Sequence, residues 1–217
     1  MDFYTEAQRE QQALHDSRRL ADAVASAIVQ TELTPQHADF IASRDFFFLS
    51  TANGNGEPTV SHKGGNPGFV RVVDSRTLAF PMYDGNGMFL SLGNIAETAK
   101  IGMLFMDFET PDRVRVQATA SATTEEAALA TCPGAIAVVQ ARIDHVFINC
   151  ARYIHKHQRV DNSPHVPDET GRQPHAAWKR IDLLQEHLSD TERERTREAG
   201  GPITEEEYGR ALMRGET

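Results

Sequence analysis

Hydrophobic residues near the start of the chain recur every three or four positions, which is the spacing of an amphipathic helix. The residues that follow this period are Leu14, Leu20, Val24, Ile28 and Val29. They predict one helix over residues 5–31. A second helix is predicted to run to about Arg44, because Thr34 can cap its start and Pro35 suits its first turn.

From Asp45 onward the apolar residues come in short runs that end at turn residues, a pattern typical of β-strands. The first run, 45–52, ends at the turn sequence NGNG and predicts a hairpin. Further strands are predicted at 57–62, 68–73, 77–82, 101–108, 113–123 and 136–149. The residues expected on the buried face of strand 113–123 are Val114, Val116, Ala118 and Ala120.

Two segments between the strands, 85–98 and 123–131, have helical patterns instead. Short strands joined by turns predict a mainly β fold with flanking helices, a barrel or a sandwich rather than a βαβ sheet. A polar loop is expected after Arg152, followed by charged helices at about 175–188 and 203–213. The predicted organisation is a helical segment at 1–44, a β domain at 45–153, and a loop with a helical extension at 154–217.

Composition narrows the class of protein. The chain has 217 residues and a net charge of −9, which argues against a nucleic-acid binder or a binder of anionic membranes. No apolar run approaches the roughly 20 residues that span a bilayer, and the start of the chain lacks the basic and apolar regions of a signal peptide. Two cysteines are too few for a disulfide scaffold. We therefore expect a cytoplasmic protein with reduced thiols.

The first cluster that could bind a ligand is Ser61-His62-Lys63-Gly64-Gly65-Asn66, at the end of a predicted strand. Lysine supplies a point charge for a phosphate, serine supplies a donor, and glycine lets the backbone approach a ligand closely. On spacing alone, an ordinary polar turn is the better interpretation. A second cluster, Gly85 to Asn94, begins with a glycine-rich turn that enters a helix and could present N–H groups to an anion. An ordinary turn with a helix cap explains it equally well.

Other candidates are weaker. Arg113 and Arg115 alternate along one strand and share a face, and two solvent-facing arginines are the better interpretation without other information. His155 and His157 form an HxH pair, but no carboxylate or cysteine stands at a recognised zinc spacing, so no metal is predicted. Cys150 is interpreted as a buried, unreactive thiol. Neither a GxSxG elbow nor a phosphate-binding P-loop is present, and no residue is predicted to act as a catalytic acid or base.

Four markers in order resemble the pyridoxamine 5′-phosphate oxidase-like FMN-binding split-barrel family. They are FFFLSTANGNGEPTVSHKGG, TLAFPMYDGNGMFLSLGNI, IGMLFMDF and RVRVQATA. The resemblance covers about Asp45 to Thr124 and extends more weakly to Tyr153. It implies an FMN-binding split β-barrel, a homodimer with FMN at the subunit interface, and an FMN-dependent oxidoreductase that acts on a small-molecule substrate. NAD(P)H is one candidate electron donor.

The resemblance also implies which residues bind the cofactor. The flavin and its phosphate chain would be lined by Ser61, His62, Lys63 and Gly64. The strand that passes the isoalloxazine ring would contain Phe80 and Pro81. Arg113 falls where the family places a polar side chain against the pyrimidine edge of the flavin. The full set of predicted cofactor residues is Ser61, His62, Lys63, Gly64, Phe80, Pro81, Asn86, Ser91 and Arg113.

The chain departs from pyridoxamine phosphate oxidases in two places. Asn86 and Gly87 stand where those enzymes use an Arg-Lys pair on the phosphate, and the C-terminal tryptophan-and-arginine motif is missing. Lys63 is therefore the candidate to neutralise the phosphate, with Asn86 and Ser91 as neutral donors. These departures argue against vitamin B6 oxidation. The alternatives are a flavin- or haem-binding protein without turnover, and a deazaflavin-dependent reductase on the same barrel.

Overall fold

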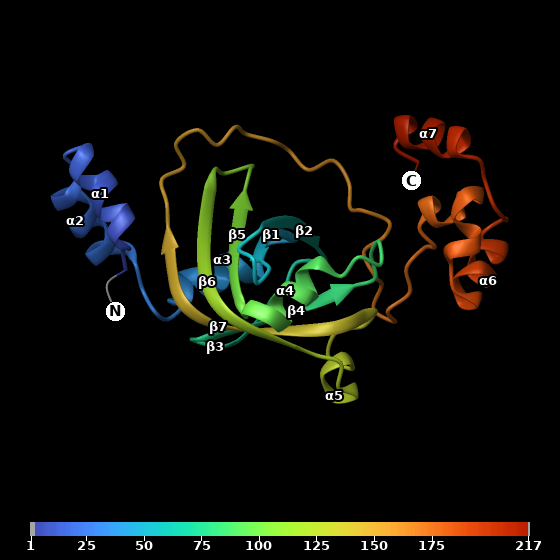
Figure 1. The fold of residues 1–217 in the computed structure, drawn as a ribbon, viewed down its shortest axis with the longest axis horizontal. Coiled ribbons are helices and arrows are strands. Elements are labelled where there is room, and N and C mark those ends of the chain that lie inside the picture. Colours follow the sequence, from blue (N-terminus) through green and yellow to red (C-terminus); the bar gives the residue numbers. More distant parts are fainter. Residues whose placement is uncertain (1–2, 217) are drawn as a thin grey trace. The chain divides into compact units, whose positions relative to one another are not determined.

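The computed structural model describes residues 3–216, which group into two compact units that divide between Asn162 and Ser163. Each unit is described by itself. The first unit contains a single antiparallel sheet with helices before, within and beside it (Figure 1). Its helices are α1 (Glu6–Leu14), α2 (Arg18–Ile28), α3 (Pro35–Ala42), α4 (Leu90–Thr98) and α5 (Glu126–Leu129).

The sheet has seven strands in the order β2-β1-β5-β6-β7-β4-β3. Their bounds are β1 (Phe46–Ala52), β2 (Pro58–Gly64), β3 (Arg71–Asp74), β4 (Thr77–Tyr83), β5 (Lys100–Asp107), β6 (Asp112–Thr123) and β7 (Ala135–Ile148). Each strand falls where a short apolar run predicted one, and the NGNG turn joins β1 to β2. The prediction of a mainly β fold with flanking helices is confirmed.

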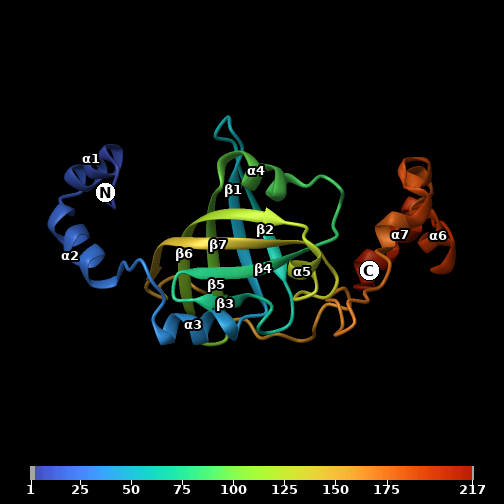
Figure 2. The same ribbon diagram turned by 90° about the horizontal axis from the view of Figure 1, so that it is seen from below.

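The sheet curls until strands far apart in its order face each other across the core, and Figure 2 shows β4 and β7 crossing β1 and β5. The ring of Phe47 on β1 lies with its centroid 5.1 Å from that of Phe80 on β4 and 5.1 Å from that of Phe105 on β5. All three side chains are fully buried. The predicted inner face of β6 is also confirmed, because Val114, Val116, Ala118 and Ala120 are all buried.

The N-terminal helix prediction was right about helix content and wrong about continuity. The chain breaks at His15–Ser17, where Asp16 adopts a left-handed conformation with φ 48°, and α2 folds back beside α1. The hydroxyl of Tyr4 donates to the carbonyl of Ala21 at 2.9 Å, and these tertiary contacts favour the turn over one long helix. The second prediction is confirmed: Thr34 caps α3 in a capping box and Pro35 occupies its first turn.

The second unit has two 3₁₀ helices and two α-helices after the polar loop. They are η1 (Ala177–Arg180), η2 (Asp182–His187), α6 (Asp190–Glu198) and α7 (Glu205–Arg214). A continuous helix at 175–188 was the wrong prediction, because Ile181 is extended and forms a parallel bridge with Ile203. The sequence analysis missed α6, whose sequence DTERERTRE has no apolar period.

Buried polar groups hold the second unit together. His175 Nε2 lies 2.9 Å from Thr196 Oγ1, and Lys179 Nζ lies 3.2 Å from Glu192 Oε2. His175 Nδ1 is 3.7 Å from the same carboxylate oxygen. Burial lowers the pKa of His175, although the Glu192 carboxylate opposes this shift and Lys179 adds to it.

Replacing Phe47 by alanine tests the core contact. We expect Phe47→Ala to lower the free energy of unfolding by about 3–5 kcal/mol, since it removes a fully buried ring and leaves a cavity. Urea unfolding followed by circular dichroism measures the change. Val73→Ala, at an exposed strand position, is the matched control and should change stability by less than about 0.5 kcal/mol. Equal effects of the two variants would contradict the assignment.

The second unit should loosen on acidification. Because the pKa of His175 is lower in the folded unit than the ordinary value near 6.5, the unfolded state binds more protons, so stability falls as the pH drops below about 6.5. Hydrogen exchange at the amides of α6 should therefore be faster at pH 5.5 than at pH 7.5 after correction for intrinsic rates. His175→Gln should weaken this dependence, and His187→Gln, at an exposed position, should leave it unchanged.

Candidate functional site

The pairing of β2 with β1 decides which way the predicted cofactor residues face. Lys63 lies opposite Phe47 and Ser61 lies opposite Leu49, and both of these partners are buried in the core. Residues directly opposite each other on antiparallel strands share a face. Lys63 and Ser61 therefore belong to the inner side of the edge strand β2, whereas His62, opposite Phe48, belongs to the outer side.

Lys63 is a half-buried cation. Within residues 3–216 no carboxylate or carbonyl oxygen pairs with its ammonium group. Burial lowers the pKa of Lys63, because desolvation disfavours the charged form. Holding a cation in such a place without a counter-charge is costly, so an anion would be stabilised strongly here.

The start of α4 lies at the same corner. Ser61 Oγ on β2 is 3.3 Å from Ser91 Oγ in the first turn of α4. The residue before the helix, Phe89, has φ 51° and makes no side-chain cap, so the first N–H groups of α4 lack a capping acceptor. Uncapped helix N-termini favour anions through these donors and the helix dipole.

Two hydrogen bonds fix α4 on the sheet. Asn94 Nδ2 donates to Thr51 Oγ1 at 2.9 Å, and Thr98 Oγ1 donates to the carbonyl of Ala52 at 3.0 Å. Lys63 lies two residues beyond Ser61 on the same side of β2, about 7 Å along the strand. The cation, the hydroxyl pair and the helix start thus form one site, called the Lys63 corner below, which suits a phosphate group.

The other predicted cofactor residues either lie apart from the Lys63 corner or add no side-chain donor to it. The side chain of Phe80 is fully buried in the core, and Pro81 is buried on the opposite side of β4. Asn86 is exposed, and its Oδ1 accepts a hydrogen bond from the N–H of Met88 at 3.1 Å. Gly64 lies opposite Phe46 on the outer side, where an added Cβ would meet the ring of His62 at 3.0 Å.

Inside one chain, the side chains of Arg113 and Lys63 face opposite sides of the sheet. Three strand spacings separate β2 from β6, or about 14 Å. Arg113 Nη2 donates to the carbonyl of Cys150 at 2.9 Å, while its buried Nε lacks an acceptor. Arg115 is exposed on the same outer face, as its spacing predicted.

The outer face of the sheet carries an apolar strip that the sequence analysis did not identify. Strand pairing places residues side by side across five strands, and one such row contains His62, Phe48, Leu104, Arg115 and Phe147. Phe46 stacks on His62 and on Phe108, with centroid distances of 5.4 and 5.9 Å. The available signal was the run FFFL, in which both faces of β1 are apolar.

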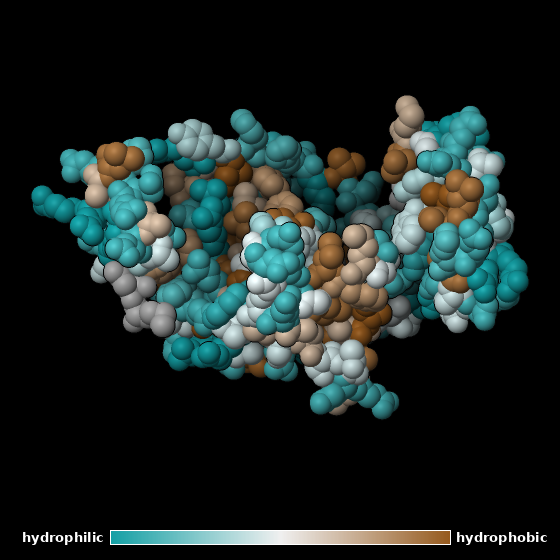
Figure 3. All heavy atoms as spheres, in the orientation of Figure 1, coloured by the Kyte–Doolittle hydropathy of each residue, from teal (hydrophilic) through white to brown (hydrophobic). Residues whose placement is uncertain are grey.

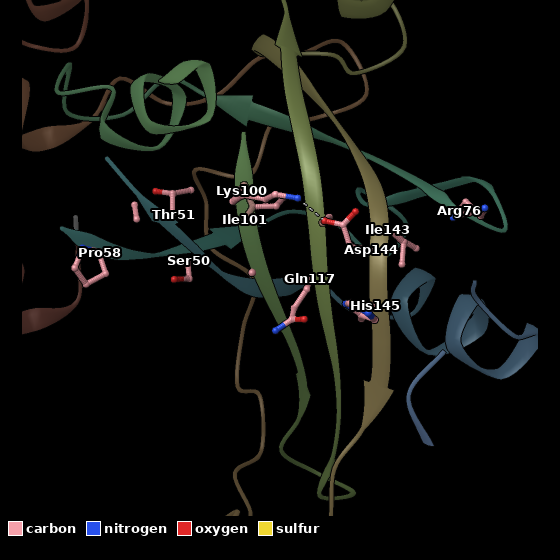
Figure 4. Close-up of a pocket in the computed structure, with 13 residues that line it drawn as sticks. Ser50, Thr51, Pro58, Arg76, Lys100, Ile101, Gln117, Ile143, Asp144 and His145 are labelled. Atoms are coloured by element: carbon pink, nitrogen blue, oxygen red, sulfur yellow. Dashed lines mark hydrogen bonds and ion pairs between the residues drawn. The ribbon is translucent and has the colours of Figure 1, made fainter. Parts of the chain in front are cut away.

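Hydrophobic surface also gathers beside α4 (Figure 3). Met88, Phe89 and Leu90 are each more than half exposed at its start. Farther down the outer face is a shallow cavity of about 600 Å³, shown in Figure 4. None of the predicted cofactor residues lines it.

The floor of this cavity is a second row of paired residues, namely Ser50, Gly102, Gln117 and His145. At its side Lys100 donates to Asp144 at 3.0 Å, and Thr119 donates to the same carboxylate at 2.9 Å. Burial alone would raise the pKa of Asp144, but these two hydrogen bonds and the positive charges of Lys100 and Arg142 together outweigh it, so the pKa is lowered. The Asp144 carboxylate is therefore already satisfied within the chain.

Cys150 is exposed, so the interpretation as a buried thiol was wrong. The strong strand signal before it ends at Ile148, and Cys150 lies in the following loop, where no packing covers it.

In the described part of the chain no three His, Cys, Asp or Glu side chains are grouped so that they could hold a metal ion. No helix among residues 3–216 is long and apolar enough to cross a membrane.

A family model described as pyridoxamine 5′-phosphate oxidase matches residues 33–159, which span the sheet and the Lys63 corner. The chain belongs to the pyridoxamine 5′-phosphate oxidase family. The curled sheet is thus the split barrel of this family, as the sequence resemblance implied. A comparison with curated proteins found no match.

Solved structures similar to this family member include HupZ and two proteins whose titles name different ligands, FMN and haem. HupZ of Group A Streptococcus is 21% identical, with 54% of this chain and 94% of that chain covered and a TM-score of 0.44. An FMN-binding protein of Syntrophomonas wolfei is 15% identical, with 67% and 96% covered and a TM-score of 0.38. HutZ, the haem storage protein of Vibrio cholerae, is 15% identical, with 54% and 94% covered and a TM-score of 0.39.

Anion binding at the Lys63 corner can be tested with inorganic phosphate. We expect millimolar phosphate to raise the melting temperature of the wild-type chain, because the anion binds only the folded state. Lys63→Met should abolish this increase, since it removes the single cation of the corner. Lys156→Met, at an exposed loop position, is the matched control and should respond as the wild type does. An equal response of Lys63→Met would contradict the site.

Proposed function

We propose that the protein is an FMN-dependent oxidoreductase that works as a homodimer with FMN at the subunit interface. The observation that carries this proposal is the unpaired, half-buried Lys63 beside the uncapped start of α4. The corner has one cation, a pair of hydroxyls and free backbone N–H groups, which together match a phosphate monoester. Membership of the family makes the phosphate of FMN the first candidate.

The residues present fit FMN without the Arg-Lys pair that pyridoxamine phosphate oxidases use. Lys63 supplies the positive charge, and the hydroxyls of Ser61 and Ser91 supply neutral donors. Asn86 is near in sequence, and its exposed amide is free to turn towards a ligand once the bond to Met88 is released. When bound, FMN supplies the hydride chemistry, and the chain supplies binding and electrostatics.

A second copy is needed if Arg113 is to contact the same flavin. Within one chain Arg113 lies on the opposite face of the sheet from Lys63. The outer face also carries three half-exposed aromatic side chains, Phe46, Phe48 and Phe147, which a second copy would remove from water. We therefore propose that the outer face is the dimer interface and that Arg113 serves the flavin held by the partner.

In that arrangement Arg113 has a defined task. Its buried Nε has no acceptor among the residues that the structure describes, so it is available to donate to an electron-rich edge of a bound ring. A fixed guanidinium there would stabilise negative charge that develops on the pyrimidine edge of the flavin. The substrate is a small molecule, and the presence of Asn86 and Gly87 in place of the Arg-Lys pair argues against pyridoxamine phosphate.

The cofactor itself is the first test. Protein purified from cells should be yellow, absorb near 450 nm and release FMN on denaturation, as identified by mass spectrometry. Colourless protein that takes up no added FMN would contradict the proposal. A Soret band or a released deazaflavin would assign the chain to one of the other two ligand classes.

Complementation between two inactive variants tests the shared site. Lys63→Met and Arg113→Met should each bind FMN weakly as homodimers. In a mixed dimer, one of the two sites combines the intact Lys63 of one subunit with the intact Arg113 of the other. That site should bind FMN as the wild type does. After full subunit exchange, about a quarter of all sites should bind FMN tightly. If Lys63 and Arg113 acted within one chain, mixing would restore nothing.

A further inference from the structure

The N-terminal helices α1 and α2 form a hairpin, called the arm below, that has no buried residue. Helices of nine and eleven residues are marginal on their own in water, and most helical stability in proteins comes from packing an apolar face. Within the arm the two helices touch through small or polar groups, such as the ion pair of Arg9 with Asp22 at 2.5 Å. The apolar side of the arm is still exposed.

That apolar side is a stripe at helical spacing. Leu20 and Val24 are one turn apart on α2 and are 66% and 42% exposed, and Leu14 at the end of α1 is 74% exposed. Figure 3 shows hydrophobic atoms at the surface of this hairpin. Apolar side chains that share one side of a helix are typical of a face that packs against a partner.

Both ends of the arm are attached to β7, at the border of the outer face. The ring of Phe3 contacts the rings of His145 and Phe147, with centroid distances of 5.1 and 5.8 Å. After α2, Gln30 exchanges two backbone hydrogen bonds with Val146, at 2.9 and 2.7 Å. The arm is therefore fixed beside the surface that the proposed dimer covers, and it lies outside the residues matched by the family model.

The strand order indicates what the arm would meet. If Arg113 of one copy reaches the Lys63 corner of the other, then β6 of the first copy lies over β2 of the second. Beyond β6 comes β7, whereas β2 is the last strand of its edge. The β7 border of one copy, with its arm, then falls at the free β2 edge of the other.

Exposed apolar side chains flank that edge strand, with Val60 on its outer side and the start of α4 on its inner side. Val60 on β2 is 66% exposed, and Met88, Phe89 and Leu90 at the start of α4 are 62%, 54% and 51% exposed. The hydroxyl contact of Ser61 with Ser91 keeps the two elements together. An apolar stripe and an apolar edge, each unpartnered in one chain, complement each other in a pair.

We propose that the arm is a clasp for a second copy of this chain, in which Leu20 and Val24 pack against Val60 and the Met88–Leu90 segment of the partner beside its Lys63 corner. The inference rests on the proposed function, because the dimer geometry comes from the shared flavin site. In this arrangement each cofactor site is incomplete until the arm of the other copy covers its edge.

Two aspartate variants of the full chain separate the clasp from a general effect of charge. Val24→Asp places a carboxylate in the apolar stripe, and Ser26→Asp places the same charge on the other side of α2. Val60→Asp tests the receiving edge. Sedimentation measures the dimer dissociation constant, circular dichroism confirms folding, and the FMN content of the wild type is measured in parallel. A photo-crosslinking amino acid at position 24 reports which residues the arm contacts.

We expect Val24→Asp and Val60→Asp to raise the dissociation constant by about tenfold or more, and Ser26→Asp to leave it unchanged. Cross-links should produce covalent dimers joined to the peptides around Val60 and Met88. Equal dissociation constants for Val24→Asp and Ser26→Asp, a monomeric wild type, or cross-links confined to one chain would overturn the clasp. A wild type that dimerises in this way but binds no FMN would instead overturn the proposed function.

Discussion

The packing of Phe47 against Phe80 is the contact on which the rest of the structure depends. It joins the second strand of the sheet to the sixth and so closes the sheet around one core. Once β1 faces the core with Phe47 and Leu49, its pairing with β2 fixes the direction of every side chain on that strand. Lys63 and Ser61 must then face inward and His62 outward, so the closure of the barrel creates the Lys63 corner and the apolar outer strip together.

At the Lys63 corner, the desolvation cost of an unpaired cation indicates that a ligand would be stabilised there. Desolvation lowers the pKa of Lys63 and no counter-charge in the described residues offsets it. The uncapped start of α4 adds donors that also lack partners. By contrast, Asp144 beside the outer cavity is satisfied by Lys100 and Thr119, so that cavity shows no comparable deficit. This imbalance, more than the residue types, is the reason why we propose the corner as a binding site.

Much of the fold could be predicted from local pattern. Alternation identified β6 and its buried face, and cap chemistry identified the start of α3. The two wrong helix predictions concern segments whose structure depends on tertiary contacts. The break at Asp16 follows from packing of α2 on α1, and the bridge of Ile181 with Ile203 interrupts a helix-like sequence. Helix α6 has charges in place of an apolar period, and its stability comes from Thr196 and Glu192 in the polar interior of the second unit.

The candidate site, like the fold, could be predicted from the sequence only where it depends on neighbouring residues in the chain. The adjacency of Ser61, His62 and Lys63 suggested a phosphate site, but only strand register could separate Lys63 from His62 and from Arg113. The most direct measurement is calorimetric titration of the deflavinated protein with FMN and with riboflavin, which differ by the phosphate alone. FMN should bind about 100-fold more tightly to the wild type, and Lys63→Met should remove most of that difference. Equal affinities for FMN and riboflavin in the wild type would contradict the account.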